Sequence, residues 1–288
     1  MATYQDIKGL RVKYLAADPS VLRLGDVWYN STTGTLKGNV LIASTTSQTG
    51  LSRGGSYNQM ASASGGSANA AWVAGGSPPV PSGFNETEEF NGSGWTAGGN
   101  MNYSGFNRSG FGTLTAGVAV GGRTPAASVA NTEEYDGTTW TNNPNAAPVA
   151  ARGYACGGPQ TAGIVFSGHA APAYPVAVTI TQYFDGSAWS VPPATMNTPR
   201  ANASGCGIQT AALAVSGESG PTPTAPTTVE EYNGSAWATT TSLNTGRGNQ
   251  GPAMCQGSTT SATMLGGNPP PGVAIENWDG TSWATSTA

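Results

Sequence analysis

The chain has 288 residues, of which only 9% are charged, and its formal net charge is −4. This acidic balance argues against a nucleic-acid-binding surface, and we find no apolar run long enough for a transmembrane helix. Three cysteines and a single histidine fit neither a disulfide framework nor a Cys-x-x-Cys metal site. We therefore expect no metal, no cofactor, no nucleic-acid partner and no membrane insertion.

The first 49 residues differ from the rest of the chain. They carry a net charge of +2, whereas the remaining residues carry −6. The N-terminus lacks the apolar stretch of a secretory signal, so we predict no signal peptide. Residues 7–15 alternate apolar with basic side chains, which is typical of an extended strand that packs on a partner.

Residues 25–38, with the sequence GDVWYNSTTGTLKG, predict a hairpin that turns at Thr-Thr-Gly. This stretch resembles a short element found near the start of many bacteriophage tail and virion proteins. The resemblance implies that residues 1–49 are an attachment segment that docks on a virus particle. The candidate docking residues are Lys8, Arg11, Lys13, Trp28 and Tyr29. The alternative is a plain N-terminal extension that packs on the rest of its own chain.

Beyond this segment, one pattern occurs five times. An aromatic or charged run reaches Asn-Gly or Asp-Gly, and a strand carrying tryptophan follows. Asn-Gly and Asp-Gly favour the left-handed dihedral angles of a tight hairpin turn. The closing tryptophans are 45, 49, 48 and 46 residues apart and are Trp95, Trp140, Trp189, Trp237 and Trp283. A fixed period of this size indicates a repeat architecture.

Each hairpin follows a short apolar run that ends in Gly-Gly or Ser-Gly, and a segment of small residues comes before that run. Each repeat therefore offers four short strands, which is the blade of a β-propeller. The order of these features resembles the kelch motif over roughly residues 50–288, although two copies have Ser-Gly and the third lacks the Glu pair. We predict an all-β fold, a five-bladed kelch-like β-propeller with four-stranded antiparallel blades. Five complete repeats should leave no vacancy in the ring; the alternative is a sixth blade completed by residues 25–38.

One arginine occurs in each repeat, just before the predicted inner strand: Arg53, Arg108, Arg152, Arg200 and Arg247. Five equivalent arginines suit an anion-binding ring, or each one pairs with a glutamate of its own or the next blade. Because the repeats are acidic, we favour the pairing, with Glu89, Glu134 and Glu231 as examples of partners.

Catalytic and metal-binding patterns are weak in this sequence. Cys156, Cys206 and Cys255 lie in register on three inner strands, and we interpret them as buried thiols rather than metal ligands. His169 has no nucleophile or orienting acid near it in the sequence. Paired carboxylates such as Glu230-Glu231 point to opposite faces of a strand. We therefore predict no enzymatic activity.

A proline-containing loop follows each Gly-Gly or Ser-Gly, and the connections between repeats are also long. In a four-stranded blade both sets of loops emerge on one face of the propeller, which we call the long-loop face. Proline restricts φ and so lowers the entropy lost on binding; alternatively, it only blocks edge pairing and protease attack. The candidate binding residues on this face are Phe84, Arg123 and Tyr174, since sugar rings stack on aromatic side chains.

The two resemblances together imply a bacteriophage virion protein, tail-associated and made in the host cytoplasm. We expect other virion proteins as partners, a homo-oligomer in the particle, and either a host surface glycan or a neighbouring virion protein as the ligand of the propeller. One alternative is a capsid decoration protein without a receptor role. The other is a polysaccharide-acting propeller enzyme, for which the long loops contain few acids, mainly Glu86 and Glu218.

Overall fold

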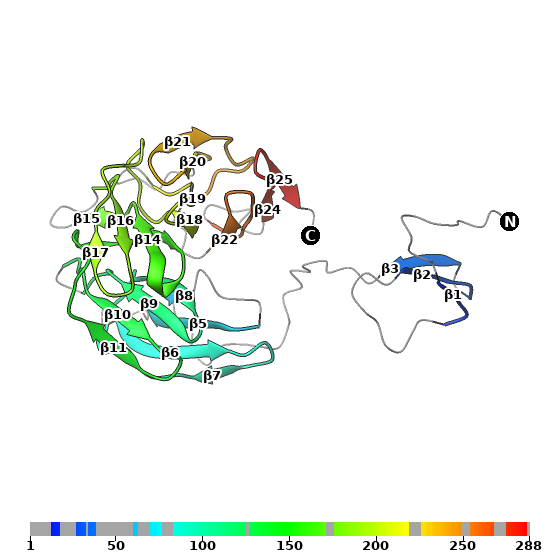
Figure 1. The fold of residues 1–288 in the computed structure, drawn as a ribbon, viewed down its shortest axis with the longest axis horizontal. Coiled ribbons are helices and arrows are strands. Elements are labelled where there is room, and N and C mark those ends of the chain that lie inside the picture. Colours follow the sequence, from blue (N-terminus) through cyan, green and yellow to red (C-terminus); the bar gives the residue numbers. More distant parts are fainter. Residues whose placement is uncertain are drawn as a thin grey trace. The chain divides into compact units, whose positions relative to one another are not determined.

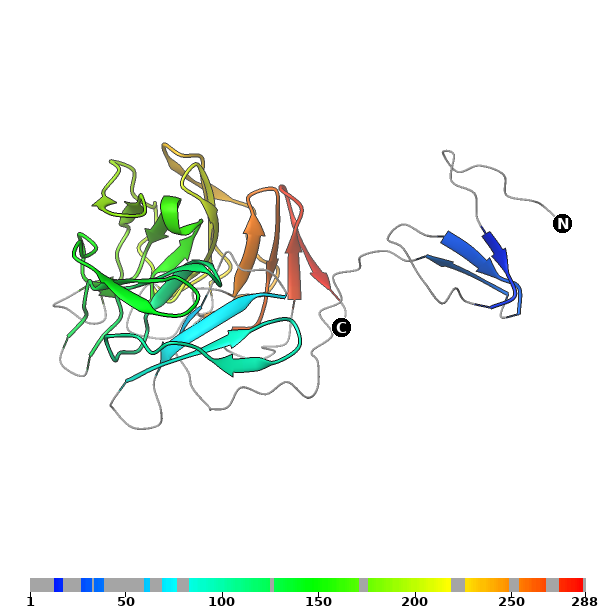
Figure 2. The same cartoon turned by 60° about the horizontal axis from the view of Figure 1, so that its bottom comes forward.

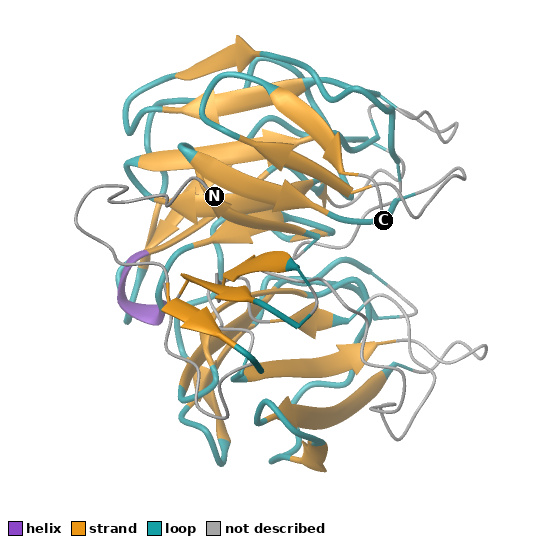
Figure 3. Ribbon diagram, turned by 90° about the vertical axis from the view of Figure 1, so that its right-hand side faces the viewer, coloured by secondary structure: helices purple, strands orange, loops and turns teal. Residues whose placement is uncertain are grey.

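The computed structural model describes residues 13–17, 27–32, 34–38, 60–62, 69–76, 83–124, 127–170, 176–218, 226–248, 254–267 and 275–286. The chain forms two compact units, Met1–Gly50 and Leu51–Ala288. The regular elements in the described residues are strands, apart from the short 3₁₀ helix η1 (Gln160–Ala162), which is drawn in purple in Figure 3. No helix in this part of the chain is long and apolar enough to cross a membrane.

The first unit contains a three-stranded sheet in the order β1-β2-β3. Its strands are β1 (Lys13–Leu15), β2 (Val27–Asn30) and β3 (Thr35–Gly38). Strands β2 and β3 form a hairpin over the residues in which the sequence predicts one, and β1 lies parallel to β2. The Asn30 side chain accepts a hydrogen bond from the Thr32 amide at 3.1 Å, which stabilises the turn.

The second unit is a β-propeller of five blades, each a four-stranded antiparallel sheet (Figures 1 and 2). Blade 1 consists of β4 (Ala61–Ser62), β5 (Ala71–Gly76), β6 (Phe84–Phe90) and β7 (Trp95–Ala97). Blade 2 consists of β8 (Ser109–Thr113), β9 (Ala116–Val120), β10 (Thr132–Tyr135) and β11 (Trp140–Asn143). Blade 3 consists of β13 (Ala155–Gly157), β14 (Gly163–Phe166), β16 (Thr181–Phe184) and β17 (Trp189–Ser190). A separate two-stranded sheet pairs β12 (Ala151–Arg152), which precedes blade 3, with β15 (His169–Ala170), which lies between β14 and β16 in the sequence.

Blade 4 consists of β18 (Ser204–Ile208), β19 (Ala211–Val215), β20 (Val229–Tyr232) and β21 (Trp237–Thr240). Blade 5 consists of β22 (Cys255–Ser258), β23 (Ser261–Met264), β24 (Ile275–Trp278) and β25 (Trp283–Ser286). The predicted all-β, five-bladed fold with four-stranded antiparallel blades is confirmed.

The repeated turns close in the same way in every blade. In blade 2, Oδ1 of Asp136 accepts hydrogen bonds from the amides of Thr138 (2.8 Å) and Thr139 (2.7 Å). The residues in the place of Asp136 in the other blades are Asn91, Asp185, Asn233 and Asp279. The glycine that follows has φ between 89° and 95° in all five copies, which explains why the sequence repeats Asn-Gly or Asp-Gly.

The backbone at the end of each second strand also explains the repeated Gly-Gly or Ser-Gly pair, because both residues of the pair have positive φ angles. Its first residue has φ near 60°, a value that Ser167 (63°) and Ser216 (58°) adopt as well as glycine. Its second residue has φ between 98° and 114° and is glycine in every blade. Side chains reach the left-handed helical region at a modest cost, whereas the larger φ is essentially restricted to glycine. This difference explains why only the first position varies.

Apolar cores lie between neighbouring blades. Between blades 3 and 4, Phe166 packs against Trp237, with ring centroids 4.8 Å apart, and Trp237 stacks on Tyr232. The indole Nε1 of the repeated tryptophan also donates to a threonine hydroxyl of the preceding blade. The three pairs are Trp140–Thr87 (2.8 Å), Trp189–Thr132 (2.9 Å) and Trp237–Thr181 (2.9 Å).

The contact differs in blade 5, because Val229 of blade 4 occupies the position of these threonines. Among the residues that the structure describes, Nε1 of Trp283 has no hydrogen-bond partner. A buried donor without a partner reduces stability by more than a made hydrogen bond contributes.

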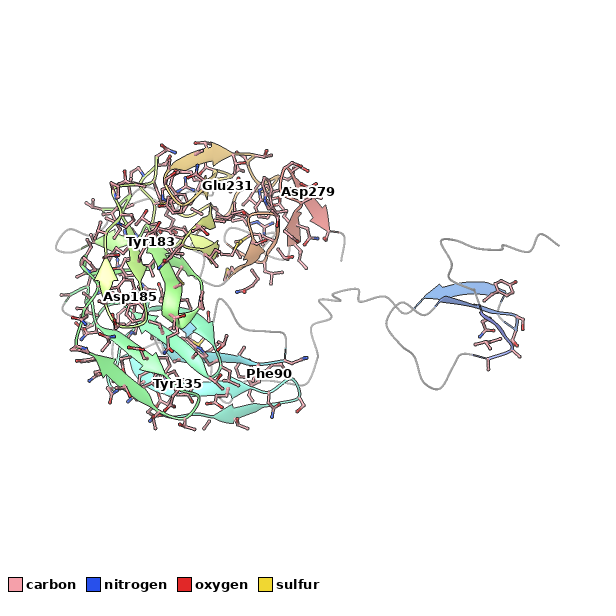
Figure 4. The ribbon with its side chains drawn as sticks, viewed as in Figure 1. Phe90, Tyr135, Tyr183, Asp185, Glu231 and Asp279 are labelled. Atoms are coloured by element: carbon pink, nitrogen blue, oxygen red, sulfur yellow. The ribbon has the colours of Figure 1, made fainter. Side chains whose placement is uncertain are left out.

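Four interblade cores join the five blades in the described part of the chain: blades 1–2, 2–3, 3–4 and 4–5. The blades follow an arc that is open between blades 5 and 1, with Asp279 and Phe90 on its two sides (Figures 1 and 4). Phe90 is half-buried, whereas its counterparts in the other blades are fully buried: Tyr135, Phe184, Tyr232 and Trp278. The expectation that five repeats leave no vacancy is therefore wrong for the described residues, because the core that would join blades 5 and 1 is missing there.

We predict that Val229→Thr stabilises the protein by about 0.5–1.5 kcal/mol, because the new hydroxyl gives Trp283 the acceptor that its counterparts have. The matched control is Thr181→Val, which removes the acceptor of Trp237 and should destabilise by about 1–3 kcal/mol. Urea unfolding followed by tryptophan fluorescence measures both changes. A destabilised Val229→Thr variant would contradict the assignment of Val229 to this position.

Candidate functional site

The long-loop face is built by backbone pairing between interblade connectors and the loops that follow the second strands. Phe106, in the connector before blade 2, exchanges two backbone hydrogen bonds with Arg123, which follows β9 (3.2 and 2.9 Å). Ala201 and Glu218 exchange two such bonds at 2.8 Å in blade 4. The two kinds of loop therefore emerge together, as predicted, and the pairing fixes the start of each loop.

In the described residues, the opposite face carries the tight Asn-Gly and Asp-Gly turns and short first-hairpin turns, one of which contains η1. The glycine of each Asn-Gly or Asp-Gly turn lies against the first hairpin turn of the same blade. A Cβ on Gly137 would lie 3.2 Å from Thr115, and one on Gly186 would lie 3.2 Å from Thr161. One face is thus closely packed and the other elaborated, which directs the search for a binding site to the long-loop face.

Two predicted binding residues, Phe84 and Arg123, lie on neighbouring segments of this face. The carbonyl oxygen of Phe84, at the start of β6, accepts a hydrogen bond from the Gly105 amide at 3.3 Å. The next residue, Phe106, lies under the guanidinium of Arg123, whose Cζ is 5.0 Å from the ring centroid. This distance is that of a cation–π contact.

Sequence reasoning missed two aromatic residues of the same connector, Tyr103 and Phe106. Tyr103 is 41% exposed, and Phe106 is half-buried beneath Arg123. We call Phe84, Tyr103, Phe106 and Arg123 the aromatic platform. A signal for it exists in the sequence. The asparagine that binds the buried glutamate and the repeated arginine are three positions apart in blade 4 (Asn197 and Arg200) and in blade 5 (Asn244 and Arg247). In blade 2 they are six positions apart (Asn102 and Arg108), so this connector carries a three-residue insertion.

The remaining predicted site residues are only partly described. Tyr174, Lys8 and Arg11 lie outside the described residues. Lys13 and Trp28 are register partners in the parallel pair of β1 and β2, and Tyr29 lies between Tyr14 of β1 and Leu36 of β3. The structure therefore brings Lys13, Trp28 and Tyr29 onto one small sheet.

The repeated arginines form buried ion pairs rather than an anion-binding ring in the blades where the pair is described. The distances are 2.7 Å for Arg108–Glu133, 2.6 Å for Arg200–Glu230 and 2.7 Å for Arg247–Glu276, and every side chain is at most 3% exposed. Burial lowers the pKa of Arg108 and Arg200, and the adjacent carboxylates act in the opposite direction. The arginines are thus structural cations.

The pairing itself was predicted, but its partners were not. In blades 2, 4 and 5 each arginine contacts the first residue of the Glu-Glu or Glu-Asn pair of its own blade, so the suggested partners Glu134 and Glu231 are wrong. The suggested partner Glu89 stays a prediction, because Arg53 lies outside the described residues. Successive side chains of a strand point to opposite faces. The second glutamate therefore lies on the other side of its sheet, where Glu134 accepts a hydrogen bond from Asn143 at 2.6 Å.

Each buried glutamate also holds the interblade connector. Glu230 accepts hydrogen bonds from the amides of Asn197 (2.7 Å) and Thr198 (3.1 Å), and Asn197 donates to the carbonyl of Trp237 at 3.0 Å. Glu133 binds Asn102 and Tyr103 in the same way. The amide of Tyr103 donates at 3.2 Å, so this ion pair positions one residue of the aromatic platform directly.

Blade 3 departs from the pattern. Gln182 replaces the glutamate and accepts a hydrogen bond from the Val149 amide at 2.9 Å. Arg152 and His169 are register partners in the short antiparallel sheet of β12 and β15. Burial and the nearby charge of Arg152 lower the pKa of His169 to about 4, so this imidazole is neutral near pH 7.

These features define a β-propeller with one elaborated face and buried ion pairs that brace its loops. The described residues contain no group of three or more His, Cys, Asp or Glu side chains placed to hold a metal ion. No protein-family model matches the sequence, and no curated protein matches it.

We predict that Glu230→Ala destabilises the protein by about 3–5 kcal/mol, because it leaves Arg200 charged and buried without its carboxylate. The matched control, Glu231→Ala, removes the neighbouring half-buried carboxylate and should change stability by less than about 1 kcal/mol. Urea unfolding of both variants measures the difference. Equal effects would contradict a structural role for the ion pair.

Proposed function

We propose that this protein is a tail-associated virion component of a bacteriophage. Residues 1–49 dock it on the particle, and a kelch-like propeller over residues 50–288 presents its long-loop face for binding. The virion part of the proposal rests on the resemblance of residues 25–38 to phage virion elements. It is supported by the division of the chain into a small unit that contains this hairpin and a separate propeller.

The observation that carries the binding role is the aromatic platform. Its backbone is closely fixed, because a Cβ on Gly83 would lie only 2.7 Å from Cα of Gly105. Glycine at both positions therefore lets the strand that starts at Phe84 approach the connector. A rigid platform loses little entropy when it binds a ligand.

The chemistry of the platform suits a surface glycan. Aromatic rings offer a flat apolar surface against which the C–H face of a sugar stacks, and Tyr103 adds a hydroxyl. Arg123 supplies several N–H donors for sugar hydroxyls or carboxylates, and its contact with Phe106 orients the guanidinium. We propose a host surface glycan as the ligand, with other virion proteins and further copies of this chain as neighbours in the particle.

The proposal is one of binding rather than catalysis. The three buried glutamates that pair with arginine already accept hydrogen bonds from a guanidinium and two connector amides each, which suits bracing. The partly exposed aromatic Tyr103 on the long-loop face favours a receptor-binding role over capsid decoration alone.

For the platform, we predict that Tyr103→Ala and Arg123→Ala each weaken binding of residues 50–288 to immobilised host lipopolysaccharide or capsular polysaccharide by roughly tenfold or more. Val191→Ala is the matched control, since Val191 is exposed but lies outside the platform. Surface plasmon resonance measures affinity, and thermal melting checks that each variant is folded. Unchanged affinity in both platform variants would exclude this site.

For the attachment segment, we predict that a chain lacking residues 1–49 folds but is not incorporated into particles. Gold-labelled antibody microscopy of purified particles measures incorporation and location, with the full chain as the control. Label at the tail supports the proposal, and label over the head favours capsid decoration. Normal incorporation of the truncated chain would contradict docking through this segment.

A further inference from the structure

Two thiols meet at the junction of blades 4 and 5. Cys206 lies on the inner strand β18 and Cys255 on the inner strand β22, and their Sγ atoms are 3.0 Å apart. Both cysteines are unoxidised and fully buried in the core between these blades. Sulfur atoms at this separation are closer than in ordinary van der Waals contact, so little movement is needed to join them.

The registers of the strands explain why these two thiols meet. Cys206 is the partner of Leu213 in its sheet, and both face blade 5. Cys255 is the partner of Met264, and both face blade 4.

The third thiol behaves differently. Cys156 faces the preceding blade, where its Sγ donates to the carbonyl of Gly110 at 3.0 Å. Cys156 and Cys255 thus face the preceding blade, whereas Cys206 faces the following one. The expectation that all three cysteines lie in one register is wrong, because a one-residue shift on a strand reverses the side-chain direction.

We propose that Cys206 and Cys255 form an interblade disulfide when the chain folds in the presence of a low-molecular-weight disulfide such as oxidised glutathione. One cysteine thiolate attacks the small disulfide, forms a mixed disulfide and releases one small thiol. The second cysteine then attacks the protein sulfur of that mixed disulfide and releases the other small thiol. The two cysteines are oxidised, the small disulfide is reduced to two thiols, and both protons leave with those thiols.

The timing of this reaction follows from burial. The hydrogen bond to Cys206 and burial raise the pKa of the Cys255 thiol, so this thiol is protonated and poorly nucleophilic in the folded chain. Exchange therefore takes place during folding, before blade 5 packs on blade 4. Once formed, the bond is shielded from reductants by the same core.

The location of the bond gives it a structural consequence. Blade 5 is at one end of the open arc, and in the described residues its apolar core is shared with blade 4 alone. The same core contains the unpartnered Nε1 of Trp283. A crosslink across 49 residues at this position restrains the separation of the last blade.

The test refolds the full chain with a reduced and oxidised glutathione mixture, or with excess reductant, and measures intact mass and disulfide-linked peptides. We expect the glutathione-refolded chain to lose two hydrogen atoms in mass and to yield a peptide that links Cys206 to Cys255. Its melting temperature should be higher than that of the reduced chain by roughly 5–10 °C. The variants Cys206→Ala and Cys255→Ala should lose both effects, and the matched control Cys156→Ala should keep them.

The unmodified chain alone decides the outcome, so the test does not depend on the folding of the variants. A linked peptide between residues 206 and 255 supports the proposal. Absence of this peptide after glutathione refolding, or a linked peptide that contains Cys156, overturns it. These results are independent of particle docking and glycan binding.

Discussion

The buried contact between arginine and the first glutamate of each pair holds the propeller's blades and loops in one arrangement. In blades 2, 4 and 5 it connects the start of the inner strand to the third strand and to the connector from the preceding blade. Two opposite charges in a low-dielectric core are tolerated best when hydrogen bonds satisfy their remaining atoms, and here the connector amides donate to the oxygens of each glutamate. The loops of the long-loop face therefore start from fixed points, although the loops themselves vary in length and composition.

The aromatic platform is a consequence of this arrangement. Glu133 fixes Asn102 and Tyr103, and the three-residue insertion that follows places Phe106 beside Arg123 of the next loop. A repeat protein can vary one connector in this way without disturbing the others, because each blade contacts mainly its neighbours. In many proteins the binding residues lie on loops that a rigid sheet scaffold holds in place. We propose glycan recognition here on that basis.

Because each blade contacts mainly its neighbours, the blades at the two ends of the arc can differ in chemistry, and they do. The half-buried Phe90 of blade 1 has the chemistry of an interblade core. Blade 5 instead carries exposed polar side chains that are linked by hydrogen bonds. Thr263 donates to Asn277 at 2.8 Å, and Asn277 donates to Ser286 at 2.6 Å. Polar outer faces are typical of terminal repeats, whereas an apolar face is typical of an internal one. Blade 5 therefore resembles a capping repeat, and blade 1 does not.

Local backbone requirements made the fold predictable from the sequence. Asn-Gly and Asp-Gly specify the hairpin turns, and the glycine with φ near 100° ends each second strand, so the number of blades and their four strands follow from the spacing of these signals. The same signals place Phe84 and Arg123 in the segments that follow the second strands, but they give no sign of their neighbours Tyr103 and Phe106. Which glutamate pairs with arginine, which thiols meet and where the arc opens depend on the side of a strand that each residue faces. That choice is made by long-range register and blade packing, because a one-residue shift leaves the local pattern almost unchanged and reverses every contact.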